Sequence, residues 1–145
     1  MAITPSWFGL GLLAMLEDPM DLEALGAANK LKLALFTDTY VPNRDTDTVY
    51  SGLSGELANG NGYTTAGATL ASVATSYDAS SDQVRLDFAD VSWTFTAAKT
   101  WRYGVVYETD TSKLLGLLSW DSNQTVSTAY SIVLDSAGLL FIDVT

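Results

Sequence analysis

The sequence predicts a mostly β protein, an antiparallel β-sandwich of about seven or eight strands with a short N-terminal helix or arm. One observation is the alternation of apolar and polar residues along several segments, as in residues 84–88, VRLDF. Another is the recurrence of turn-forming residues about every 8–12 residues, which is typical of all-β folds. A length of 145 residues suits one hydrophobic core.

Residues 7–16, WFGLGLLAML, are predicted to form a short helix with Ser6 as its cap. Its face of Phe8, Leu12, Met15 and Leu16 either covers one end of the sheet or docks on a neighbouring subunit. The letters G-x-G-x-x-A within this run indicate no dinucleotide site, because that motif needs a preceding strand and a βαβ unit.

Residues 17–29 are expected to connect this helix to the β domain, with a little helix that ends at Gly26. These patterns divide the chain into two parts. Residues 1–29 form an N-terminal helix or arm with its connector, and residues 30–145 form a β-sandwich domain. Residues 30–36, KLKLALF, alternate leucines with Lys30, Lys32 and Ala34 and are predicted to form the first strand of this domain. A surface loop over 37–47 follows, in which Asp45 and Asp47 have calcium-ligand spacing but lack the rest of an EF-hand. A solvated loop is favoured there, and a bound cation stays open.

The remaining segments are predicted from alternation and turn signals. A short helix is expected over 48–57, a compact turn over 59–62, and a hairpin from 69–77 and 83–88. The apolar parity slips at residues 89–90, which predicts a turn or bulge. Further half-buried strands are expected over 91–95, 101–107, 114–120, 130–135 and 139–144, with a tight turn over 135–138. Trp93, Trp101 and Trp120 lie on the apolar parity and are predicted core residues.

Composition excludes several classes of function. The formal net charge of −10 and the scattered basic residues make nucleic acid an unlikely ligand by electrostatic repulsion. No cysteine or histidine is present, which removes disulfides, thiolate and histidine metal sites, and histidine-based triads. The sequence thus predicts no cofactor and no metal.

No group of residues supports a catalytic role. Carboxylate pairs such as Asp87 with Asp90 are expected by chance in so acidic a chain, so we expect no enzyme activity. Arg85 is predicted to form an ordinary cross-strand ion pair, whereas Arg102 could pair or serve as an interface anchor. The N-terminal apolar run is shorter than the ~20 residues of a membrane span and follows no basic segment, which favours synthesis in the cytoplasm and no membrane partner.

From residue 31 onward the chain contains four blocks in a recurrent order. They are LKLALFTDTYVPNRDTDTVYSGLSGELANGNGYTTAGATL, VRLDFADVSWTFTAAKTWRYGVVYE, LLGLLSWD and SIVLDSAGLLFIDV. Within them stand a Tyr-Ser-x-Leu-x-x-Glu-like segment at 50–56, a Gly-Tyr-x-x-x-Gly-Ala-x-Leu segment at 62–70, and an Arg-Tyr-x-Val-Val-Tyr strand at 102–107. In this order the chain resembles small virion structural proteins of tailed bacteriophages.

The resemblance implies a particle component made in the host cytoplasm, with capsid decoration or cement as the first expectation. Its implied partners are the major capsid protein and copies of itself, a trimer being one candidate. A tail or head-fibre attachment protein, and a carbohydrate-binding or receptor-recognition module, stay as alternatives. We expect the N-terminal helix, the 37–47 loop and one strand arginine to contact partners, through Trp7, Phe8, Leu12, Met15, Tyr40, Arg44 and Arg102.

Overall fold

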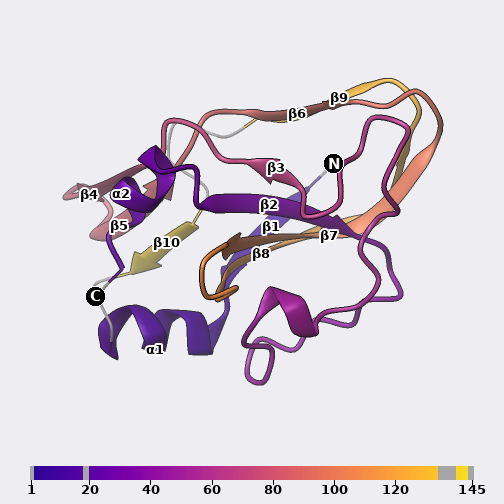
Figure 1. Cartoon of the computed structure of the whole chain (residues 1–145). Helices are drawn as coiled ribbons and strands as arrows, with labels where there is room; N and C mark the ends of the chain where they lie inside the picture. Colours follow the sequence, from indigo (N-terminus) through magenta and orange to yellow (C-terminus); the bar gives the residue numbers. More distant parts are fainter. Residues whose placement is uncertain (1, 18–19, 134–139, 144–145) are drawn as a thin grey trace.

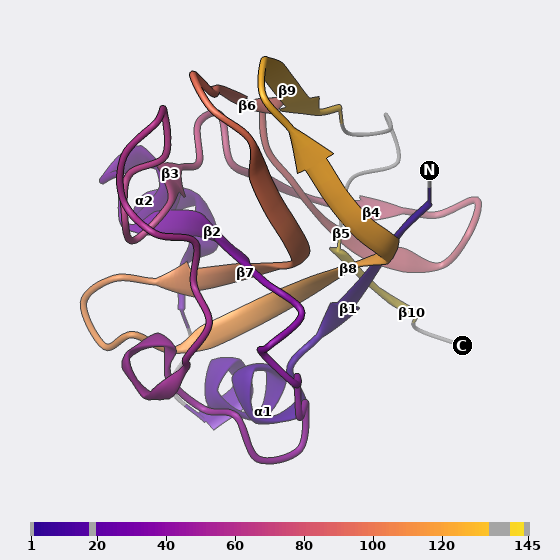
Figure 2. The same ribbon diagram turned by 90° about the vertical axis from the view of Figure 1, so that its right-hand side faces the viewer.

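The computed structural model describes residues 2–17, 20–133 and 140–143 of the chain. This part is mostly β with antiparallel sheets, as the sequence predicts. Its strands form sheets of five, three and two members. Figures 1 and 2 show the five-stranded sheet in the middle of the molecule, with the two-stranded sheet above it and the N-terminal helix below it.

The five-stranded sheet is buried on both faces over its central strands. Along β2, the side chains of Leu31, Leu33 and Leu35 enter one hydrophobic core, while Ala34 and Phe36 enter another. A strand covered on both sides reads as a continuous apolar run. The strand expected over residues 30–36 is therefore confirmed, and the structure buries both of its faces. In spatial order, the strands are β1 (Ile3–Trp7), β8 (Leu114–Val126), β7 (Lys99–Glu108), β2 (Leu31–Phe36) and β3 (Ala68–Thr69).

Two register shifts in the β7–β8 pair change which way the side chains point. Trp101 pairs with Gln124 but Tyr103 pairs with Ser119, so the ladder is interrupted at Arg102. Trp101 then packs in the first core, whereas Tyr103 packs against the second. The prediction that Trp101 and Tyr103 share one face is wrong, because a bulge reverses the alternation.

The two smaller sheets contain the strands of the middle of the chain. The predicted hairpin is confirmed, since β4 pairs with β5 antiparallel across the turn at 79–82. Ala89 lies between β5 and β6 and donates its N–H to the carbonyl of Ala71, so the parity slip marks a passage from one sheet to another. The smaller sheets consist of β10 (Leu140–Asp143), β5 (Gln83–Asp87) and β4 (Ala74–Asp78), and of β6 (Val91–Thr94) and β9 (Ala129–Ile132).

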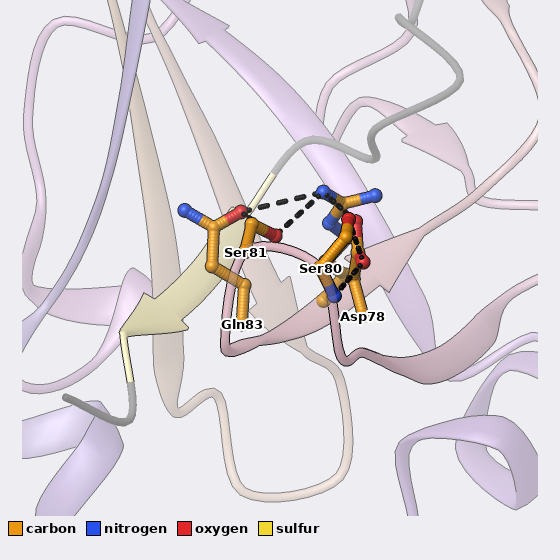
Figure 3. A network of polar contacts seen from close by, with 5 residues as sticks. Asp78, Ser80, Ser81 and Gln83 are labelled. Carbon is orange, nitrogen blue, oxygen red and sulfur yellow. Dashed lines mark hydrogen bonds and ion pairs between the residues drawn. The ribbon is translucent and has the colours of Figure 1, made fainter.

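The turn of the β4–β5 hairpin is held by a network of polar side chains (Figure 3). The N–H and hydroxyl of Ser80 donate to Asp78 Oδ1 at 2.8 and 2.6 Å, and these bonds lower the pKa of Asp78 to about 2. Arg85 forms an ion pair with Asp78 and donates to Ser81 Oγ at 3.1 Å. The predicted cross-strand ion pair of Arg85 is therefore confirmed, with Asp78 of the neighbouring strand as its partner.

Two cores lie on opposite faces of the five-stranded sheet. The first core joins that sheet to both smaller ones, because Leu86, Trp93 and Ile132 pack with residues of β2, β7 and β8. Trp101 and Trp120 are its largest fully buried side chains, and the predicted burial of Trp93, Trp101 and Trp120 is confirmed. The second core lies under irregular chain and the N-terminal helix, and consists of Phe8, Ala34, Phe36, Tyr40, Val105, Tyr107, Leu114 and Leu117.

The carboxylate of Glu56 joins the three short motifs quoted above, at residues 50–56, 62–70 and 102–107. Its Oε1 accepts from the hydroxyl of Tyr63 and the N–H of Ala66, both at 2.8 Å. Its Oε2 accepts from Tyr50, whose ring stacks on Tyr107 with centroids 4.1 Å apart. Residues from the three motifs thus meet around one carboxylate, and they hold irregular chain against the sheet.

The N-terminal segment differs from its prediction. The first helix, α1 (Gly9–Glu17), begins two residues later than expected, and Trp7 lies in β1, which pairs with β8. Ser6 does not cap this helix as predicted, because its hydroxyl donates to the carbonyl of Leu117. Phe8 is the residue before the helix, and its carbonyl accepts from the N–H of Leu12. A strand does come before the glycines, contrary to expectation, but it is antiparallel to β8, so it builds no βαβ unit.

Two further predictions concern the segments that flank β2, and a third concerns the C-terminal turn. The short helix expected over 48–57 is limited to a single 3₁₀ turn, η1 (Tyr50–Gly52), and the following residues bridge to the end of β2. The connector does contain a short helix, α2 (Leu22–Ala27), capped by Asp21. The tight turn expected over 135–138 lies outside the described residues.

Candidate interaction surface

Helix α1 is apolar on all sides, and it lies on the surface of the chain. Its inner face is fixed by Gly11, where a Cβ atom would stand 2.1 Å from the carbonyl oxygen of Leu114. Met15, four residues on, packs against the first core. This close approach to β8 needs a residue without a side chain, so α1 is part of the folded domain.

The outer face of α1 exposes large apolar side chains to solvent. Leu13 is 45% and Leu16 is 82% exposed, and with Gly9 they follow the i, i+4, i+7 spacing of one helix face. We call Gly9, Leu13 and Leu16 the outer stripe. A helix that is apolar all round is normally buried, so the exposure of this stripe makes it the candidate interaction surface.

Opposite charges stand at the two ends of the outer stripe. At the N-terminal end, Gly9 N–H donates to the carbonyl of Arg44 at 3.0 Å, which fixes the 43–47 turn beside the helix. At the other end stands the exposed Glu17. No ion pair joins either side chain to another among the described residues. Both charges are therefore available to a partner.

Several of the predicted contact residues are core residues instead. Phe8 is 0% exposed and Tyr40 is 5% exposed, so both stabilise the fold and offer no surface to a partner. Tyr40 also donates its hydroxyl to Asp47 Oδ2 at 2.8 Å, which ties the 37–47 loop to the second core. Trp7 and Met15 pack partly buried against the first core.

The other predicted residues are not gathered in one place. Leu12 is partly buried on α1, and Arg44 is exposed beside the start of this helix. Arg102 lies at the bulge of β7, where its Nε is buried without a hydrogen-bond partner. Arg102 forms no ion pair among the described residues, and Glu108 accepts from Thr111 in the β7–β8 turn.

Sequence reasoning missed Leu13 and grouped Leu16 on one helix face with the buried Phe8, although a signal for the exposure of both leucines was available. A helix of nine residues without a polar side chain before Glu17 cannot bury every side against one sheet. Val41, which is 80% exposed in the 37–47 loop, was missed as well, because the sequence pattern around it does not distinguish an exposed valine from a buried one.

The 37–47 loop offers no evident cation site. Asp47 Oδ2 already accepts from Tyr40 and from the N–H of Asn43 at 2.9 Å, while Asp45 is exposed. Over residues 2–17, 20–133 and 140–143, no group of three or more potential metal ligands gathers.

One hollow of about 380 Å³ lies between α2 and the β7–β8 turn, and its polar groups serve the fold. Asp21 accepts from the N–H of Ala24, and Glu108 accepts from Thr111. Asp110 pairs with Lys30 at 2.6 Å, which raises the pKa of that lysine. The hollow thus presents no pair of free carboxylates that could serve as general acid and base.

Comparison with protein-family models, with curated proteins and with solved structures found no match. None of the helices in the described part of the chain is long and apolar enough to cross a membrane.

Proposed function

We propose that the chain is a virion structural protein of a tailed bacteriophage, a capsid decoration or cement protein that binds the outer shell and stabilises it by protein–protein contacts. The observation that carries the proposal is the exposed outer stripe of α1 on an otherwise well-packed domain, which suits contacts between neighbouring subunits on a shell. The block order of residues 31–145 supplies the class of protein. In this role the chain acts without catalysis, in the virion, after synthesis in the host cytoplasm.

The fold supports such a role. We infer that the two smaller sheets act together as one layer of a sandwich opposite the five-stranded sheet, since side chains of all three enter the first core. A closely packed β domain without cysteine forms in a reducing cytoplasm, and its acidic surface keeps free copies soluble and away from DNA.

A carbohydrate-binding module is less well supported than a protein-binding one. Such modules stack sugars on exposed aromatic rings, and Trp93, Trp101 and Trp120 are all buried. Tyr77 is the large exposed aromatic among the described residues, and its hydroxyl is bonded to Asp82. Attachment to the tail or to a head fibre differs from decoration in position and number of copies.

The copy number of the chain in purified particles tests the proposal. Quantitative mass spectrometry would give its ratio to the major shell protein. A ratio near one, or a simple fraction of one, is the result expected for decoration. A ratio of a few per cent would place the chain at the tail or a single vertex, and its absence from particles would contradict a virion role.

Truncation at the N-terminus would be a poor test of shell binding. Removing residues 1–16 deletes β1, which pairs with β8, together with Phe8 of the second core. Loss of binding would then follow from loss of the fold. Substitutions on the outer stripe leave the inner face of α1 unchanged, so they test the part of this stripe in contacts between subunits without loss of the fold.

A further inference from the structure

We propose that the outer stripe of α1 pairs with the same stripe of a second copy of the chain, antiparallel about a two-fold axis near Leu13. The inference rests on the proposed function in treating this stripe as a protein interface, and it names the partner. Three features of the described residues point to a second copy: an apolar centre, charges of opposite sign at the ends, and a small residue at the first turn.

The apolar centre of the stripe explains why α1 needs cover. Leu13 and Leu16 stand one turn apart on the outer face, where Leu13 is about half exposed and Leu16 is largely exposed. In an antiparallel pair of helices, Leu16 of each copy would lie beside the first turn of the other, where exposed Gly9 leaves room. Each copy thus supplies both the projecting side chain and the space for it, which is the self-complementarity of a two-fold interface.

The charges at the ends of the stripe select the antiparallel arrangement. Arg44 stands beside Gly9 at one end, and Glu17 is the last residue of α1 at the other. Antiparallel pairing places Arg44 of each copy near Glu17 of the other, so that two ion pairs form. A parallel arrangement would bring like charges together. Opposed helix dipoles favour the antiparallel arrangement as well.

The size of the stripe sets the strength of the pairing. A helix of nine residues is only about 13 Å long, so it buries much less than the roughly 1,200 Å² of a stable complex. The pairing is therefore weak in dilute solution. On a shell that holds copies side by side, the local concentration is high and the same contact becomes effective.

Sedimentation of the purified full chain at increasing concentration, with charge-reversed variants, tests the pairing. We expect a reversible monomer–dimer equilibrium for the natural sequence. Arg44→Glu alone and Glu17→Arg alone should each weaken the dimer about tenfold or more, because each converts two attractions into two repulsions. The double variant Arg44→Glu/Glu17→Arg should restore the natural affinity, since the two ion pairs re-form with reversed sign.

A single introduced cysteine tests the position of the axis. The natural chain contains no cysteine, so any disulfide must join the introduced residues. Leu13→Cys, near the axis, should form a disulfide-linked dimer rapidly under mild oxidation. Val133→Cys is the matched control, because Val133 is 71% exposed and lies at the end of β9, outside the stripe. Circular dichroism would check that both variants keep the fold.

Other outcomes would overturn the inference. A natural chain that stays monomeric up to millimolar concentration, or forms trimers, contradicts two-fold pairing. Failure of the double variant to recover contradicts the antiparallel arrangement, as does equal oxidation of the two cysteine variants. If the chain is monomeric but present in particles at shell-wide copy number, the inference fails and the proposed function stands. If it dimerises as described but is absent from particles, the proposed function fails and the pairing stands.

Discussion

The two faces of the five-stranded sheet are covered in different ways. On the first face, strands of the smaller sheets bring apolar side chains such as Leu86 and Trp93 onto the sheet. On the second, irregular chain lies over Phe36 and Tyr107 and is held by hydroxyl groups bonded to Asp47 and Glu56. Regular strands satisfy their backbone through one another, whereas irregular chain needs side-chain partners. The first face therefore depends on packing and the second on hydrogen bonds.

High pH should affect the second face most, with loss of the fold as the largest effect. On this face, burial together with the Asp47 and Glu56 carboxylates raises the pKa of Tyr40 and Tyr50, and burial raises the pKa of Tyr107 to about 12. Burial also raises the pKa of Tyr63, whose ring lies in the first core while its hydroxyl donates to Glu56. An unfolded tyrosine titrates near pH 10, so each raised pKa gives stability that is complete below about pH 10 and is lost as the pH rises toward the folded value.

Absorbance at 295 nm and far-ultraviolet circular dichroism, recorded together during an alkaline titration, would check this. We expect several tyrosines to ionise only as the fold is lost, above about pH 10. Ionisation of all seven tyrosines near pH 10 with the fold intact would contradict the buried hydrogen-bonded cluster.

Trp101→Ala tests the packing of the first face. Trp101 is fully buried and contacts the rings of Phe95, Trp120 and Tyr130, so its truncation leaves a large cavity. The free energy of unfolding should fall by about 3–5 kcal/mol, measured by urea denaturation. Trp101→Phe, which refills part of the space, should cost clearly less. An equal loss in both variants would show that something other than volume matters at this site.

Glu56→Ala tests the hydrogen bonding of the second face. The hydroxyls of Tyr50 and Tyr63 and the N–H of Ala66 lose their acceptor, at an expected cost of about 2–3 kcal/mol in the free energy of unfolding. Glu56→Gln keeps one acceptor oxygen and should lose about half as much. If neither substitution changes the unfolding midpoint in urea, the second face does not depend on this carboxylate.

Sequence reasoning predicted the first face well and the second poorly. Alternation located the β4–β5 hairpin, β6 and the buried Trp101, because half-buried strands carry a period of two. It located β2 as well, but the alternation of its leucines with Lys30 and Lys32 gave no sign that Ala34 and Phe36 enter a second core. It missed the reversal at Arg102, since a bulge leaves no mark in composition.

The second face depends on contacts between distant residues, which local patterns do not contain. Tyr50, Tyr63 and Tyr107 meet at Glu56 only after the chain has folded, and residues 48–57 carry a spacing that also suits a helix. The candidate surface shares this problem. The helix itself was predicted, but which of its sides the sheet covers depends on the close approach of Gly11 to β8.

Gly11→Ala tests that close approach. Alanine is normally better than glycine in a helix, yet its Cβ would stand 2.1 Å from the carbonyl oxygen of Leu114. We expect a loss of about 1–3 kcal/mol in the free energy of unfolding. Gly52→Ala is the matched control, because the nearest atom to its Cβ would be 3.7 Å away, and it should be neutral or slightly stabilising. A stabilised Gly11→Ala variant would mean that α1 is not held against β8.

The smallest expected effect on stability gives the most direct test of the central claim that α1 has an inner face for the fold and an outer face for a partner. The measurement is urea unfolding and sedimentation of Leu16→Glu beside the natural chain. Because Leu16 is 82% exposed, the free energy of unfolding should change by less than about 0.5 kcal/mol, while the concentration-dependent dimer is lost. A markedly destabilised Leu16→Glu, or a dimer of unchanged affinity, would contradict the account.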